Sequence, residues 1–135
     1  MTFRPRFLHI SCHGAKCKNE DKYYLAFENT DKMCLLDRLT EDRLKNLLGN
    51  GEEHSVQVVF VSACHSQKLG ELFKRVGIPV VIAINQLTPV LDDVCRLFAT
   101  MFYSHMITGS SPYRAFEEAK NTVKASSIET QHCCC

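Results

Sequence analysis

The chain has 135 residues, a length that fits one domain and can bury a working hydrophobic core. Hydrophobic residues make up 45% of it and charged residues 23%, which excludes global disorder. The formal net charge is +1 with acidic and basic residues interspersed, so no basic stripe indicates nucleic-acid binding and no acidic block indicates a solvating tail.

The first part of the chain contains the patterns of short strands and one helix. The expected elements are a strand over Arg6–Ile10, a loop over Lys16–Lys22, strands over Tyr23–Phe27 and Met33–Leu36, and a helix over Thr40–Leu48. The turn residues Asn29-Thr30-Asp31 predict that the two middle strands form a hairpin. Thr40 is the expected N-cap, and Leu44, Leu47 and Leu48 form the expected apolar face.

The second part alternates buried strands with helices. The expected elements are strands over Val56–Val61 and Pro79–Ile84, and helices over Leu69–Val76, over Val90–Met106 and from Ser111 onward. The continuous apolar run that ends at Val61 is typical of a strand buried on both faces, as in a parallel sheet. Ser111 followed by Pro112 is a helix-start signal, because proline suits the first helical position.

This alternation predicts an α/β fold, a three-layer sandwich with a mainly parallel sheet, plus a small β-hairpin. We expect a domain over residues 1–125 and a flexible, Cys-rich tail over 126–135. Disorder is the simplest interpretation of the tail, with palmitoylation and weak metal binding as alternatives.

The eight cysteines do not form regular pairs along the chain. Cys34 and Cys95 sit among apolar residues, where a thiol behaves as a small hydrophobe. The start of the chain shows no apolar signal region, and no apolar run approaches the roughly 18 residues of a membrane helix. We therefore expect a cytoplasmic protein with mostly reduced thiols and no membrane span.

Two expected strands each end in a short polar cluster, one with His13-Gly14 and the other with Ala63-Cys64. If these strands are parallel neighbours, both clusters lie at one sheet edge, because adjacent strands are about 4.8 Å apart. An imidazole can take the proton of a thiol and leave a reactive thiolate. The N–H groups of Gly14 and Cys64 would then stabilise the negative charge that develops on a peptide carbonyl oxygen.

Five segments in order resemble the CHAT family of caspase-like peptidases. They are LHISCHG, VVFVSACHS, GIPVVIAI, PVLDD and FATMFYSHMITGSSPYRAFEEAK, within residues 6–124. The resemblance implies that His13 is the general base, Cys64 the nucleophile, and Gly14 and Cys64 the oxyanion donors. It also implies a cysteine endopeptidase that needs no cofactor and acts on a peptide or protein substrate.

The sequence departs from the family pattern in three ways. Gln-Ala-Cys-x-Gly of true caspases is replaced by Ser62-Ala63-Cys64-His65-Ser66, and the tryptophan that often follows the last strand is absent. The strands that normally precede the histidine strand are also missing, so the chain resembles the C-terminal part of the domain. An incomplete sheet favours an alternative function, a non-catalytic interaction or regulatory module within a larger signalling protein. A regulatory or sensor domain could complete that sheet as a partner.

Several neighbouring residues have competing interpretations. Ser62, His65 and Asp92 are candidate substrate-binding residues, although Asp92 could equally cap the helix that follows. A zinc cluster is a further interpretation of the histidines and cysteines near the first strand: His9, Cys12, His13 and Cys17. It is disfavoured because structural zinc usually takes a second pair of closely spaced ligands.

Overall fold

The computed structural model describes residues 4–29, 31, 35–48, 55–85 and 89–126, and leaves the side chains of residues 85 and 89–92 undescribed. The chain divides into two compact units, with the boundary between residues 85 and 86. Cys34, most of the expected tail and part of the expected strand over residues 33–36 therefore lie outside the described residues.

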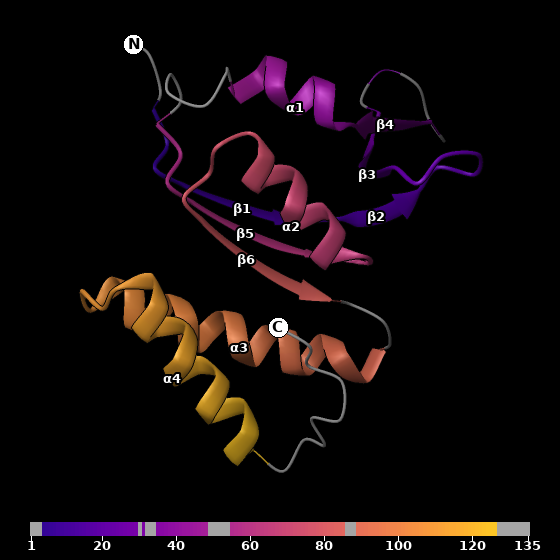
Figure 1. The fold of residues 1–135 in the computed structure, drawn as a ribbon. Helices are drawn as coiled ribbons and strands as arrows, with labels where there is room; N and C mark the ends of the chain where they lie inside the picture. The colour runs from indigo at the N-terminus through magenta and orange to yellow at the C-terminus, as the bar shows by residue number, and fades with distance from the viewer. Residues whose placement is uncertain (1–3, 30, 32–34, 49–54, 86–88, 127–135) are drawn as a thin grey trace. The chain divides into compact units, whose positions relative to one another are not determined.

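A three-stranded parallel sheet forms the centre of the first unit (Figure 1). Its strands are β1 (Phe7–Ser11), β5 (Val58–Ala63) and β6 (Val80–Asn85), in the order β1-β5-β6. All six residues of β5 are buried. The continuous apolar run in the sequence predicted this, because a central strand of a parallel sheet is covered on both faces.

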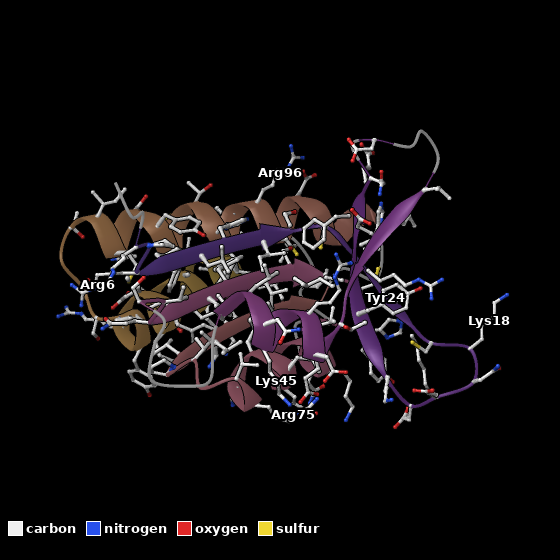
Figure 2. All side chains as sticks on the ribbon, turned by 90° about the horizontal axis from the view of Figure 1, so that it is seen from above. Arg6, Lys18, Tyr24, Lys45, Arg75 and Arg96 are labelled. Atoms are coloured by element: carbon white, nitrogen blue, oxygen red, sulfur yellow. The ribbon has the colours of Figure 1, made fainter. Side chains whose placement is uncertain are left out.

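An antiparallel sheet completes the strands of this unit. It consists of β2 (His13–Lys16), β3 (Tyr23–Glu28) and β4 (Leu36–Leu39), in that order. The expected hairpin is present as the β3–β4 pair, but its second strand lies later in the chain than predicted. Tyr24, labelled in Figure 2, belongs to β3. Its ring contacts Arg38 of β4, whose guanidinium carbon lies 4.9 Å from the ring centroid.

Helix α2 (Ser66–Arg75) covers one face of the parallel sheet (Figure 1). Leu69 and Phe73 of α2 are fully buried and belong to the same core as Val59 and Val61 of β5. The helix begins three residues before the predicted Leu69, because its first turn is polar and carries no apolar periodicity.

Helix α1 (Glu41–Leu48) begins as predicted, since the Thr40 hydroxyl accepts a hydrogen bond from the Arg43 N–H at 3.5 Å. Leu44 is buried, whereas Leu47 is 72% exposed, so the prediction that Leu47 lies on the apolar face is wrong. Glu41 joins this helix to α2. It pairs with Lys45 at 2.9 Å and with Arg75 at 3.0 Å, and these two cations lie close together in Figure 2.

The second unit is a pair of helices, α3 (Pro89–Ile107) and α4 (Pro112–Ala125). Gly109 ends the first of them with φ of 91°, a conformation that suits glycine. Ser111 caps the second, and its hydroxyl accepts a hydrogen bond from the Arg114 N–H at 3.3 Å. Both the helix stop and the helix start were predicted from these residue types.

These observations confirm a mixed α/β fold with a parallel sheet. They correct the expected small hairpin to a three-stranded antiparallel sheet, because the unpredicted β2 pairs with β3. The caspase-like three-layer arrangement stays a prediction. Among the described helices, none combines the length and the apolar character that crossing a membrane requires.

Candidate active site

The two polar clusters lie at the same edge of the parallel sheet, as the sequence predicted for neighbouring parallel strands. β1 and β5 pair in parallel, with Ser11 opposite Ser62. Cys12 continues this pairing beyond the strand end, since its N–H donates to the Ser62 carbonyl at 3.3 Å. The chain thus delivers His13 next to the carboxyl end of β5, where Cys64 follows.

His13 is the first residue of β2 and not part of a loop, which corrects the expected position. The chain leaves the parallel sheet at Cys12 and enters the antiparallel sheet at His13, which pairs with Ala26 of β3. The short segment from His13 to Lys16 has no apolar run that would indicate a strand. The segment forms a strand because it pairs with β3. His13 is exposed to solvent.

Gly14 makes the closest approach between the two clusters. A Cβ built on Gly14 would lie 1.9 Å from the carbonyl oxygen of Cys64 and 2.7 Å from the Cδ1 atom of Leu69. Only a residue without a side chain fits at these distances. The backbones of the His13-Gly14 segment and of Cys64 are therefore packed directly against each other.

Cys64 is half-buried and lies in the tight turn between β5 and α2. His65 forms the rest of this turn with φ of 58° and ψ of 27°, a left-handed conformation. The first turn of α2 contains no acidic residue, and its last turn contains Lys74 and Arg75. The positive end of the helix dipole thus faces the turn without a neutralising carboxylate in the first turn of the helix.

The three candidate substrate-binding residues have different surroundings. Ser62 is 4% exposed in the last part of β5, so its hydroxyl is turned away from solvent. His65 is exposed at the surface, and its ring lies against Tyr23 with a centroid distance of 5.4 Å. Asp92 falls within α3 of the second unit, and its side chain lies outside the described residues.

Cys12 is the second cysteine near this edge, and its environment differs from that of a nucleophile. Its Sγ donates to the His13 carbonyl at 3.6 Å. Burial raises the pKa of the Cys12 thiol, which an opposing hydrogen bond from the Ala26 backbone only partly offsets. The structure gives Cys12, Cys17, Cys64 and Cys95 as thiols rather than disulfides.

The zinc interpretation requires several side chains to converge. Among the described residues, no three histidine, cysteine or carboxylate side chains come together as a metal ion would need. His9 lies instead against Phe60, with the two rings stacked at a centroid distance of 4.9 Å. Burial among such neighbours lowers the pKa of His9.

Two residues of the site were not found from the sequence. Tyr23 touches His65 although the two belong to different elements, and no local pattern indicates such a contact. Ser66, the first residue of α2, is 1% exposed, and its hydroxyl has no hydrogen-bond partner among the described residues. Its place two residues after the candidate nucleophile was the only signal in the sequence.

The fold and the site together define a mixed α/β protein with a histidine and a cysteine delivered to one edge of a parallel sheet. The model of the CHAT domain family matches residues 1–134, nearly the whole chain. The chain belongs to the CHAT domain family, whose members are related to caspase-like proteases. Comparison with curated proteins and with solved structures gives no significant match.

Proposed function

We propose that the chain is a cysteine endopeptidase in which Cys64 is the nucleophile and His13 the general base. The close approach of Gly14 to Cys64 is the observation that carries this proposal. It brings the residue next to His13 against the residue that would attack, so the Gly14 and Cys64 backbones, which would supply the oxyanion donors, lie together.

The reaction follows from these roles. His13 takes the proton of the Cys64 thiol, and the sulfur attacks the peptide carbonyl carbon. The N–H groups of Gly14 and Cys64 stabilise the oxyanion, with the positive end of α2 close to the same turn. His13 then gives the proton to the departing amine, and the C–N bond breaks to leave an acyl thioester.

Water completes the cycle. His13 takes a proton from the water molecule, which attacks the thioester carbonyl. The carbon–sulfur bond breaks, the carboxylic acid leaves, and the sulfur regains a proton from His13. Every bond change involves only the substrate, water and these two side chains. The chemistry requires no metal or organic cofactor.

An electrophilic peptide probe, such as a peptide acyloxymethyl ketone, tests this proposal. Mass spectrometry should find the probe on Cys64 of the wild-type chain and no labelling at neutral pH in Cys64→Ala. His13→Ala should slow labelling by about 10²–10⁴-fold, the usual contribution of general base catalysis. Cys17→Ala is the matched control and should label as fast as wild type. Equal labelling of other thiols in wild type and Cys64→Ala would reject the proposal.

A second function is favoured by one feature of the parallel sheet. β1 is at an edge of that sheet within the described part of the chain. An edge strand can pair with a strand of another segment or protein. The alternative is therefore a regulatory module that a partner strand completes, and an unlabelled but cooperatively folded wild-type chain would favour it over the enzyme.

A further inference from the structure

His65 has the most unusual backbone conformation near the site. It is the one non-glycine residue with positive φ among the described residues, at 58°. Left-handed conformations disfavour residues with a Cβ, because Cβ then approaches the following carbonyl oxygen. His65 also occupies the N-cap position of α2 without a side-chain hydrogen bond that would stabilise it there. The His65 carbonyl accepts a hydrogen bond from the Leu69 N–H at 3.1 Å, and a contact of the side chain can add to this backbone anchor.

The ring of Tyr23 supplies such a contact. It lies 5.4 Å from the His65 ring, at an interplanar angle of 53°. Tyr23 is half-buried at the start of β3 and packs against the core of the first unit. Lys16, its partner across the β2–β3 pair, places its ammonium 5.7 Å from the Tyr23 ring. The packing against the core anchors Tyr23, which can therefore support the His65 ring.

We infer that Tyr23 is a positioning residue that holds His65 in the left-handed conformation and thereby directs the Cys64 thiol. This inference rests on the proposed function. His65 lies between Cys64 and the first turn of α2, so its φ and ψ angles set the orientation of Cys64 relative to the helix. A relaxed residue 65 would rotate the peptide unit that follows Cys64 and change the direction of the thiol relative to Gly14 and the helix end.

The experiment compares substitutions that separate the ring contact from the backbone conformation. Tyr23→Leu removes the ring, whereas Tyr23→Phe keeps it. His65→Ala removes the ring contact but keeps the Cβ that disfavours positive φ. His65→Gly also removes the ring contact, but glycine adopts positive φ without needing that contact. The readout is the rate of Cys64 labelling by the peptide probe, measured over a series of probe concentrations. This series gives the maximal rate constant separately from the probe concentration at which the rate is half-maximal.

Tyr23→Leu and His65→Ala should each lower the maximal rate constant about 10-fold, of the order expected for losing a contact that holds a left-handed residue. Tyr23→Phe should stay close to wild type. His65→Gly should lower the maximal rate constant less than His65→Ala, whatever its effect on probe affinity. Tyr24→Leu is the matched control from the same strand, because its ring contacts Arg38 instead, and it should keep the wild-type rate.

The double variant Tyr23→Leu/His65→Gly decides the mechanism. If Tyr23 acts through the backbone of residue 65, removing its ring has little further effect once glycine is there. A 10-fold loss from Tyr23→Leu in both backgrounds would overturn the inference, as would equal losses in His65→Ala and His65→Gly.

A urea unfolding cycle on the same variants provides a second readout that needs no reaction. The unfolding equilibrium should shift several-fold with Tyr23→Leu when residue 65 is histidine, and much less when it is glycine. An unlabelled wild-type chain would reject the proposed function, and this cycle would still decide whether Tyr23 holds His65. Equal shifts in both backgrounds would overturn the inference.

Discussion

Gly14 and Cys64 are in direct backbone contact although they are far apart in sequence. A methyl group on Gly14 would fall 1.9 Å from the Cys64 carbonyl oxygen, far inside any real carbon–oxygen contact. The neighbouring backbone cannot yield as a flexible side chain can. This contact therefore fixes the separation of the two halves of the candidate site.

Gly14→Ala should consequently destabilise the fold and disturb the site. Overpacking usually costs about 1–3 kcal/mol, and the upper part of that range is expected because the clash is with backbone. Urea unfolding measures the loss, and the rate of probe labelling should fall as well. Gly70→Ala is the matched control. Its Cβ would lie 3.3 Å from the Ala83 Cβ, and alanine favours the helix, so a change within about 1 kcal/mol is expected. Equal stability of both variants would contradict the close approach.

Two leucines of α1 provide a matched pair for the packing of the first unit. Leu44 is 4% exposed and belongs to the core, whereas Leu47 is 72% exposed on the same helix. Leu44→Ala should lower the free energy of unfolding by about 2–5 kcal/mol, because it leaves a cavity. Leu47→Ala should change it by no more than about 0.5 kcal/mol. Comparable losses in urea unfolding would show that α1 packs through a different face.

The same leucines show what sequence patterns can and cannot predict. Helical spacing identified the element and its buried Leu44, but it could not decide how wide the buried stripe is. That width depends on what packs against the helix. Similarly, the apolar run of β5 predicted a buried parallel strand, since the pattern reports burial on both faces directly.

Only the part of the site that depends on where strands end could be predicted from the sequence. Parallel strands bring their carboxyl ends to one edge, so His13 and Cys64 could be placed in one region from their order alone. β2 and the Tyr23–His65 contact were not predictable. β2 is a strand because it pairs with β3, and the contact between Tyr23 and His65 joins two elements through tertiary packing.

Cys12 offers a test of which thiol reacts. Its pKa lies above the ordinary 9.0, mainly because burial disfavours the thiolate, so very little thiolate exists at neutral pH. Iodoacetamide should modify Cys12 slowly at neutral pH and faster as the pH rises above 9.0, as followed by peptide mass spectrometry. Cys12→Ala should leave labelling of Cys64 by the peptide probe close to wild type. Loss of labelling in Cys12→Ala, with the probe found on Cys12 in wild type, would move the nucleophile to that position.

Glu41 gives the fold a defined pH dependence. Hydrogen bonds from Lys45 and then Arg75 hold the pKa of this carboxyl below its ordinary value of 4.5. A lowered pKa in the folded state means that the stabilisation is fully present above pH 4.5 and is lost as the pH falls through the folded pKa. Because the pair is partly solvent-exposed, its contribution is about 0.5–1 kcal/mol.

Glu41→Gln should therefore reduce the free energy of unfolding by that amount at pH 7, and the difference from wild type should shrink to zero in acid. Urea unfolding at a series of pH values measures both curves. Asp42→Asn is the matched control, since Asp42 shares the first turn of α1 but takes part in none of the ion pairs of the described residues. High salt should weaken the Glu41 difference, because screening acts on exposed charges. A difference that persists in acid would mean that the Glu41→Gln substitution disturbs packing and that the ion pairs are not the cause.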